Sequence, residues 1–153
     1  QIITPSVRGD NVLASSHSRE LVKFGWKGSG KSTSAGYLVG LLAGLRSIKV
    51  GVKEAILYAG MSPFVHGSRI AAALKGLREA GLSIPSDEDA FPAEERIRGE
   101  HIAEYAERLI QVDKSLFQAR FSGLLVKGFD PKNYPSHFDE VKRRILEEMR
   151  KSE

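Results

Sequence analysis

A glycine-rich turn followed by a long apolar stretch constrains this chain more than any other feature. Residues Gly25–Ser32 read GWKGSGKS, which satisfies the G-x-x-x-x-G-K-[ST] pattern of a phosphate-binding P-loop. A working P-loop follows a buried strand of a parallel sheet and relies on an acidic residue at the end of another strand. Residues 17–24 instead favour a short amphipathic helical turn, and bulky Trp26 would crowd the cradle. A nucleotide site is therefore the less favoured interpretation of a full motif match.

Positive charge is concentrated around this turn. The whole chain carries a net charge of +4, but residues 1–53 carry +6, residues 54–100 carry −3 and residues 101–153 carry +1. This distribution is typical of a protein with a polyanionic partner, although a solvated basic surface has the same composition. The chain has no cysteine, its four histidines lack metal-ligand spacing, and no apolar run is long enough to span a membrane. We therefore expect a cytoplasmic protein without metal or cofactor.

Residues 1–16 are predicted to form two short strands joined by a turn rich in Pro, Gly, Asp and Asn. Ser16 or Ser18 is the expected cap of the helical turn at 17–24. Because a sheet of two short strands is marginal, we expect a further strand from a segment that precedes Gln1.

Residues 33–50 are predicted to form the main helix, capped by Thr33 or Ser34 and ended by Gly51. Glycines recur at every fourth position of this helix, at residues 36, 40 and 44. Each glycine costs a helix up to about 1 kcal/mol relative to alanine, so the spacing indicates close approach to a sheet or to another backbone.

A strand that is continuously apolar except for Glu54 is predicted at 54–59, followed by a second helix at 68–80. If the strands on either side of the main helix pair in parallel, they are joined by a right-handed crossover. The fold class is therefore predicted to be α/β, with a small mixed sheet packed by helices. We assign residues 1–85 to this core.

Residues 86–153 are predicted to form an acidic connector and a helical C-terminal extension. Helices are expected at 100–112 and 135–151 from their apolar spacing. Residues 113–134 have no clear pattern except a short apolar run at 124–126, which we interpret as a strand.

Two loops of this pattern, Lys27–Thr33 and His66–Arg69, directly precede helix N-termini, where backbone N–H groups and the helix dipole favour anions. Because both loops follow the strand–helix pattern, we expect them to lie on one edge of the sheet. Two anion-binding sites placed in this way fit an extended phosphate backbone better than a single nucleotide. The alternative is that the glycines only turn the chain and the lysines are solvated. A protein-interaction module is a third possibility.

Seven segments of the chain match one known family and run in that family's order: LASSHSREL (13–21), GWKG (25–28), AGYLVGLLAGL (35–45), GSR (67–69), ALKG (73–76), EAGLSIP (79–85) and RGEHIAEY (98–105). On these segments, and to about residue 144, the chain resembles the L-eighteen family of large-subunit ribosomal proteins, the 5S rRNA binders, in its archaeal and eukaryotic form. Family members commonly have Asn-Thr where this chain has Lys31-Ser32, so this difference completes the P-loop pattern by accident. The family's basic N-terminal arm and first strand have no counterpart here.

The resemblance implies a ribonuclease-H-like core, no catalysis, and a place in the central protuberance of the large subunit beside neighbouring ribosomal proteins. It implies 5S rRNA as the main ligand and large-subunit rRNA as a second contact. Lysine and arginine would neutralise phosphates, while Ser, Thr and loop N–H groups would position them. His66 either reaches a 2′-OH or bonds its own backbone, and Arg98 either contacts RNA or pairs with the acidic connector. The RNA-binding candidates implied by position are Arg8, His17, Ser18, Arg19, Lys23, Lys27, Gly28, Lys31, Ser32, Thr33, His66, Ser68, Arg69 and Arg98.

Overall fold

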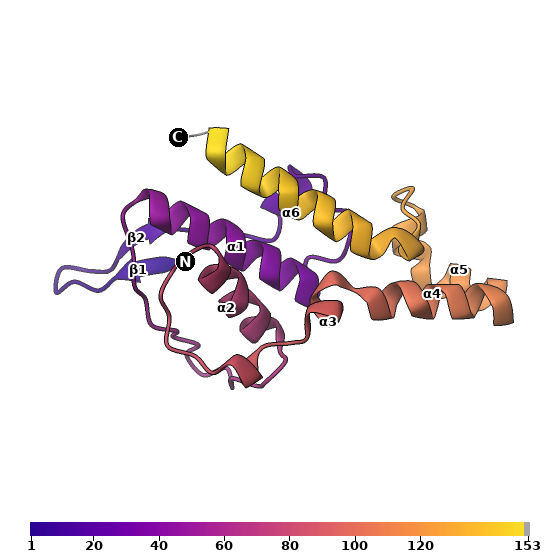
Figure 1. Cartoon of the computed structure of the whole chain (residues 1–153), viewed down its shortest axis with the longest axis horizontal. Helices are drawn as coiled ribbons and strands as arrows, with labels where there is room; N and C mark the ends of the chain where they lie inside the picture. Colours follow the sequence, from indigo (N-terminus) through magenta and orange to yellow (C-terminus); the bar gives the residue numbers. More distant parts are fainter. Residues whose placement is uncertain (152–153) are drawn as a thin grey trace.

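Helix α1 (Thr33–Lys49) is the centre of the computed structural model, which describes residues 1–151. Helix α2 (Arg69–Glu79) lies along α1, and α6 (Tyr134–Lys151) crosses it on another side (Figure 1). Strands β1 (Ile2–Thr4) and β2 (Asn11–Ala14) form a hairpin near the end of α1. The remaining helices are α3 (Glu94–Arg98), α4 (Glu100–Val112) and α5 (Lys114–Leu125). Short 3₁₀ turns lie at Glu20–Val22, Glu88–Ala90 and Pro131–Asn133.

The ends of the two central helices are set by serine caps. Ser32 Oγ accepts the N–H of Ala35 at 3.1 Å, so the prediction that Thr33 or Ser34 caps α1 was wrong by one residue or more. Ser68 caps α2 in the same way, through the N–H of Ala71 at 3.3 Å. Both caps satisfy N–H groups that a helix leaves unpaired in its first turn. The predicted end of α1 is confirmed, since Gly51 has a φ of 87° just after the helix.

The predicted cap of the first helical turn was also wrong. The 3₁₀ turn Glu20–Val22 is preceded by Arg19 and has no side-chain cap from Ser16 or Ser18. Instead the Glu20 carboxylate accepts the N–H of His17 at 2.7 Å, so the acidic side chain within the turn satisfies the donor before it.

The glycines of α1 face α2 rather than a sheet. A Cβ on Gly36 would lie 2.9 Å from the carbonyl oxygen of Arg69, and one on Gly40 would meet the carbonyl group of Ala73. Gly76 of α2 is packed in return against the backbone of Tyr37 and Leu41. The prediction of a close backbone approach is therefore confirmed, and its partner is another helix. Any side chain at these positions would push the helices apart.

The sheet contains two antiparallel strands, and Ile2 pairs with Ala14, Ile3 with Val12 and Thr4 with Asn11. The N-terminal hairpin was predicted, but the strand at 54–59 was not found. Only Glu54 forms an isolated parallel bridge, to Ser83, and the side chains of Ile56 and Tyr58 are 88% and 89% exposed. An apolar run becomes a strand only where a neighbour pairs with it, and β1 does not extend to this segment. The predicted mixed sheet and parallel crossover are therefore absent from the described residues.

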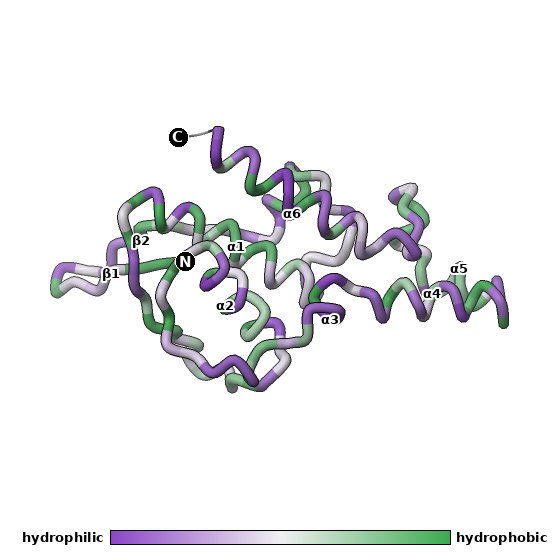
Figure 2. The backbone as a smooth tube through the Cα atoms, in the orientation of Figure 1, coloured by the Kyte–Doolittle hydropathy of each residue, from purple (hydrophilic) through white to green (hydrophobic). Residues whose placement is uncertain are grey.

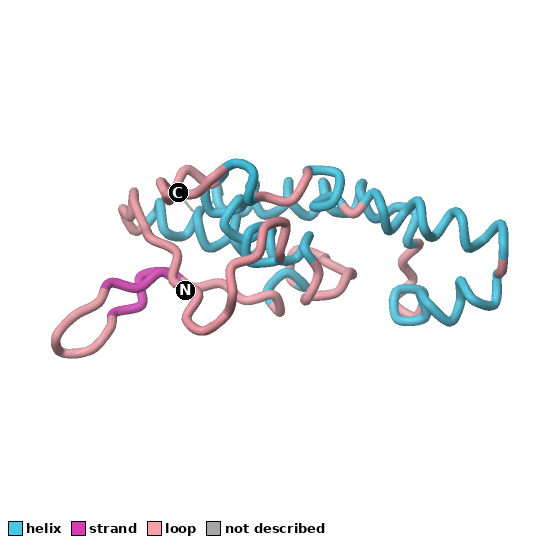
Figure 3. The backbone as a smooth tube through the Cα atoms, turned by 90° about the horizontal axis from the view of Figure 1, so that it is seen from below, coloured by secondary structure: helices cyan, strands magenta, loops and turns pink. Residues whose placement is uncertain are grey.

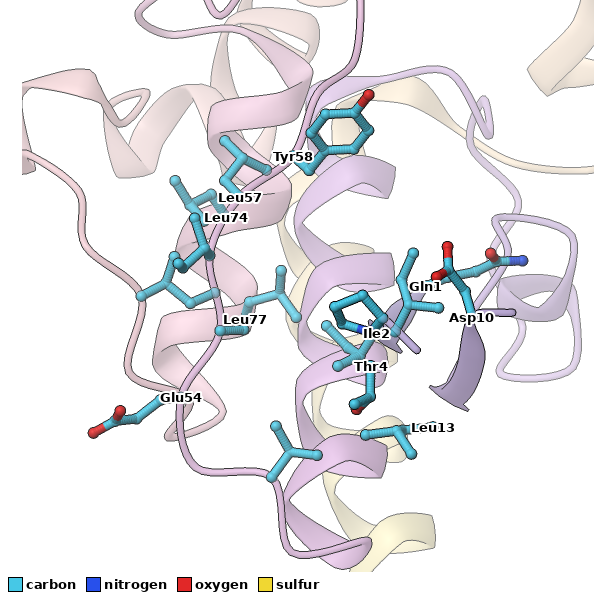
Figure 4. A pocket seen from close by; sticks show the side chains of 16 residues that line it. Gln1, Ile2, Thr4, Asp10, Leu13, Glu54, Leu57, Tyr58, Leu74 and Leu77 are labelled. Carbon is cyan, nitrogen blue, oxygen red and sulfur yellow. The ribbon is translucent and has the colours of Figure 1, made fainter. Parts of the chain in front are cut away.

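An apolar cleft separates β1 from this unpaired segment. Its volume is about 510 Å³, and its walls are the β1 strand, residues 52–58 and the apolar side of α2, where Leu74 and Leu77 point into it (Figure 4). The cleft lies at the free edge of β1, where a strand partner would stand in a wider sheet.

The C-terminal part is more helical than expected. Residues 124–126 end or follow α5 rather than forming a strand, and α3 was not predicted at all. Asp113 starts α5 by accepting the N–H groups of Ser115 and Leu116 at 2.8 and 3.2 Å. The helices predicted at 100–112 and 135–151 are confirmed as α4 and α6. The tip of the α4–α5 hairpin and the β-hairpin lie at opposite ends of the molecule (Figure 3).

The main core joins both parts of the chain. Leu38, Leu41 and Leu42 of α1 pack with Ile97 of α3 and with the buried face of α6. That face repeats every three or four residues, and the tube of α6 alternates between hydrophobic and hydrophilic in Figure 2 accordingly. The α/β class is confirmed by this arrangement of helices on a small sheet. The ribonuclease-H-like arrangement and the domain boundary near residue 85 stay predictions.

Candidate nucleic-acid interface

The glycine-rich turn Gly25–Ser32 follows the 3₁₀ turn Glu20–Val22 rather than a strand. The ring of Trp26 packs into the core on the inner side of the turn, since Trp26 is only 4% exposed, and its indole N–H donates to the Ser29 carbonyl at 3.4 Å. Its ring stacks on His137 with centroids 5.3 Å apart and meets Tyr134 edge-on at 5.5 Å. A Cβ on Gly28 would collide with the Trp26 ring, so Gly28 serves this packing.

Hydrogen bonds within and behind the turn occupy several of its polar groups. The N–H of Lys27 donates to His137 Nε2 at 3.1 Å, and the N–H of Lys31 donates to Ser29 Oγ at 3.2 Å. Ser32 Oγ donates to the Ser29 carbonyl at 2.8 Å. A P-loop leaves such N–H groups free to surround phosphates. Here the N–H groups of Lys27 and Lys31 are bonded within the protein. Their exposed side chains are the groups that remain available to a ligand.

Burial of the His137 ring lowers its pKa; the nearby Glu140 opposes this effect, and Lys27 and Arg144 add to it. A neutral ring can keep Nε2 unprotonated as the acceptor for Lys27, whereas an imidazolium cannot. The neutral state of His137 therefore stabilises the conformation of the glycine-rich turn.

The two loops that precede α1 and α2 lie side by side. The Arg69 guanidinium donates to the carbonyl oxygen of Lys31 at 3.1 Å, and the first turn of α1 packs on Arg69 through Gly36. The two loops are therefore neighbours, but the expectation that they share one edge of a sheet was wrong, because the sheet within residues 1–151 consists of β1 and β2 and neither loop directly follows one of these strands. Two capped helix N-termini and three cationic side chains (Lys27, Lys31 and Arg69) therefore belong to one region of the surface.

The segment 15–20 adjoins the same region. A Cβ on Gly30 would lie 3.2 Å from Ser18 Oγ, which places Ser18 against the glycine-rich turn. Arg46 of α1 fixes the segment, since it donates to the Ser15 carbonyl at 2.6 Å and pairs with Glu20 at 2.7 Å. The exposed side chains of His17 and Arg19 therefore stand beside those of the turn, although the His17 ring also accepts the N–H of Arg19.

Other candidates lie elsewhere or have different partners. Arg8 is in the exposed turn of the β-hairpin, and Lys23 is exposed after the first 3₁₀ turn. Arg98 pairs with Glu100 at 3.1 Å and Asp139 at 2.6 Å, and not with the acidic connector. Among residues 1–151 the His66 ring makes no hydrogen bond, so it does not bond its own backbone; it lies near Phe64 instead. Thr33 begins α1 and is half-buried. RNA contact by any of these candidates stays a prediction.

Sequence reasoning missed two residues that shape the turn, His137 and Lys127. The Lys127 ammonium donates to the carbonyl oxygen of Lys27 at 3.1 Å. Both residues are more than ninety positions away from the turn in the sequence. No local pattern could have linked them to it, because the contacts arise from the packing of α5 and α6.

Within residues 1–151, no group of three or more His, Asp or Glu side chains is arranged to hold a metal ion. The same residues contain no helix of the length and hydropathy that a membrane span needs.

Curated proteins similar to this chain are constituents of the large ribosomal subunit. The chain is 49% identical over 148 residues to large ribosomal subunit protein uL18 of Aeropyrum pernix, covering 96% of this chain and 69% of that protein. It is 48% identical to the proteins of the same name from Methanothermobacter thermautotrophicus and Thermofilum pendens, over 97% of this chain and 76% of each. No family model matches the chain.

Such identity over nearly the whole chain defines the class: this is a structural protein of the large ribosomal subunit, which acts in translation as part of a ribonucleoprotein. The chain belongs to the uL18 family, the family whose motifs it carries at Leu13–Leu21 and Ala35–Leu45.

Proposed function

We propose that this chain binds 5S rRNA and helps to anchor it in the central protuberance of the large subunit. The observation that carries the proposal is the hydrogen bond from Arg69 to the Lys31 carbonyl, which joins the N-terminal ends of α1 and α2. Helix N-termini attract anions through their unpaired N–H groups and dipole. Lys27, Lys31 and Arg69 add positive charge at the same place.

An extended backbone suits this region better than a nucleotide. The cations are spread over two loops and the adjoining segment 17–19, instead of surrounding one cavity. The N–H groups of Lys27 and Lys31 are already bonded, so the turn lacks the open cradle that a triphosphate needs. Phosphates of a nucleic-acid strand need only successive point contacts with side chains.

The proposal includes further partners and excludes catalysis. Large-subunit rRNA and neighbouring proteins of the central protuberance are proposed as secondary contacts. Residues 1–85 are proposed to supply the 5S rRNA-binding core and residues 86–153 an extension. The chain itself is proposed to have no enzymatic activity, including no hydrolysis of ATP or GTP.

A gel-shift titration with 5S rRNA over a salt series tests the main proposal. We expect affinity to fall steeply with salt, because neutralised phosphates release counterions. The double variant Lys27→Ala/Arg69→Ala should bind more weakly and with a shallower slope. An affinity that does not change with salt, or a double variant that binds like wild type, would contradict the proposal.

A nucleotide-binding assay tests the remaining alternative. We expect no saturable, Mg²⁺-dependent binding of ATP or GTP. Binding at micromolar nucleotide that is lost in Lys31→Ala would establish the P-loop interpretation instead.

A further inference from the structure

Helix α5 forms the outer arm of a helical hairpin that extends away from α1 and α2 (Figures 1 and 3). None of its residues is buried. Its aromatic side is turned towards α4, since Phe121 lies 5.3 Å from Phe117 and 6.1 Å from Tyr105 of α4. One face of α5 therefore holds the hairpin together, and the other face has no partner within residues 1–151.

The two arms of the hairpin have opposite charge. Helix α4 carries three glutamates and one arginine, for a net charge of −2. Helix α5 carries Lys114 and Arg120 and no carboxylate, for a net charge of +2, and residues 126–132 add Lys127, Lys132 and the single carboxylate of Asp130. That carboxylate accepts the N–H of Lys132 at 3.0 Å and so caps a turn. None of the ion pairs in the described chain involves Lys114, Arg120 or Lys127.

The end of α5 is fixed against the glycine-rich turn. Phe129, which is 8% exposed, packs on the ring of His137 at 4.7 Å, and His137 stacks on Trp26. The Lys127 ammonium then reaches the Lys27 carbonyl at 3.1 Å. Lys127 therefore lies at the glycine-rich turn, and α5, which carries Lys114 and Arg120 and no acidic side chain, leads up to it.

We propose that two exposed cations, Arg120 of α5 and Lys127 just after it, form a second rRNA-binding element beside the glycine-rich turn. The element contacts phosphates of the RNA that the turn binds, so this inference rests on the proposed function. The acidic α4 repels RNA from the opposite side of the hairpin, which fixes the side on which the RNA lies.

The exposed side of α5 fits an RNA partner better than a protein partner. A helix that docks on a protein through an apolar groove presents apolar anchors at positions i, i+3, i+4 and i+7. On α5 the phenylalanines lie towards α4. The exposed residues of α5 include Ser115, Ala119, Arg120 and Ser122, and the exposed large apolar residues there and just after it are Leu116, Leu125 and Val126. Cations without carboxylate partners are available to phosphates at no loss of an internal ion pair.

Binding of 5S rRNA and of protein-free large-subunit rRNA, each over a salt series, tests the proposal. The variants are Arg120→Ala, Lys127→Met and the two combined, with Arg108→Ala on acidic α4 as the matched control. The measured quantity is the slope of log affinity against log salt concentration. For the RNA that contacts Arg120 and Lys127, we expect each single substitution to reduce this slope by about one and the double variant to reduce it by about two. The control should bind like wild type. Unchanged Trp26 emission and melting temperature would show that the variants remain folded.

The outcomes distinguish a failure of this proposal from a failure of the proposed 5S rRNA binding. If the α5 double variant binds both RNAs like wild type while Lys27→Ala/Arg69→Ala binds weakly, only the role of α5 is refuted. If neither double variant changes the slope for 5S rRNA, the proposed function fails as well.

Directed hydroxyl-radical probing gives a second and independent readout. The chain has no cysteine, so an iron chelate can be attached at Ser122→Cys on the outer face of α5 or at Glu104→Cys on α4. In reconstituted large subunits, we expect rRNA cleavage from position 122 that is much stronger than from position 104. Equal cleavage from both, or cleavage of a neighbouring protein but not of RNA from position 122, would overturn the assignment.

Discussion

Tyr37 on α1 donates a hydrogen bond to the carboxylate of Glu79 on α2. The same carboxylate accepts a hydrogen bond from Lys142 of α6 at 2.6 Å, and the Lys142 ammonium lies 5.1 Å from the centre of the Tyr37 ring. Burial raises the pKa of the Tyr37 phenol, which therefore remains a donor. Burial acts to raise the pKa of Glu79, but the hydrogen bonds from Lys142 and Tyr37 together with the charges of Lys142 and Lys75 lower it below its ordinary value of 4.5.

This contact predicts a loss of stability in acid. Because the pKa of Glu79 is lower in the folded state, its contribution is present above the ordinary value of 4.5 and is lost as the pH falls through the folded value. The free energy of unfolding, measured with urea between about pH 3 and pH 7, should therefore fall less steeply in Glu79→Gln than in wild type. Glu147→Gln removes a long surface ion pair of 3.7 Å and serves as the control. Identical pH profiles for wild type and Glu79→Gln would contradict the prediction.

The close approach of α1 to α2 predicts that a single methyl group added at Gly40 strongly lowers the free energy of unfolding. In Gly40→Ala the new Cβ would meet the carbonyl group of Ala73, which is backbone and cannot rotate away. We expect destabilisation of about 1–3 kcal/mol or more from overpacking, and Gly40→Leu should be worse. Gly123→Ala on α5 is the matched control, because nothing lies within 4 Å of its Cβ position. Thermal unfolding measures both, and a Gly40→Ala protein as stable as wild type would refute the prediction.

The glycine-rich turn should loosen when His137 becomes protonated. Burial holds the pKa of His137 below 6.5, so its contribution to stability is complete above that value and declines as the pH falls through the folded pKa. Protonation removes the acceptor for the Lys27 N–H and charges a ring stacked on Trp26. Trp26 is the only tryptophan, so its emission reports the transition directly. The acid change in emission should vanish in His137→Gln and persist in His66→Gln; persistence in both would count against this role.

Substitution of Lys31 distinguishes a nucleotide-binding P-loop from an interface with an RNA backbone. As the lysine of a P-loop it would be indispensable, whereas here its carbonyl holds Arg69 and its side chain is one of several exposed cations. Lys31→Asn keeps the carbonyl, so we expect 5S rRNA binding to remain largely intact, with a salt slope reduced by about one at most. Lys27→Ala/Arg69→Ala should weaken binding more. The assignment of the interface would be wrong if Lys31→Asn abolished binding while the double variant bound normally.

Local patterns determined much of this protein. Apolar spacing located α1, α2, α4 and α6, because a helix with one buried face needs that period whatever it packs against. The glycines of α1 predicted a close backbone approach, and the charge asymmetry with the loops before α1 and α2 predicted where cations gather. Motif order in the sequence was sufficient to indicate the family.

Only the tertiary structure decided what these elements meet. The apolar run 54–59 is exposed because no strand pairs with it, and residues 114–125 are helical because Asp113 caps them and α4 supports them. The close partner of α1 is α2, and Arg98 pairs with Asp139 of α6. His137 and Lys127 reach the glycine-rich turn across 110 and 100 residues. Pairing, packing and long-range hydrogen bonds depend on which surfaces meet in space, and local sequence does not specify that.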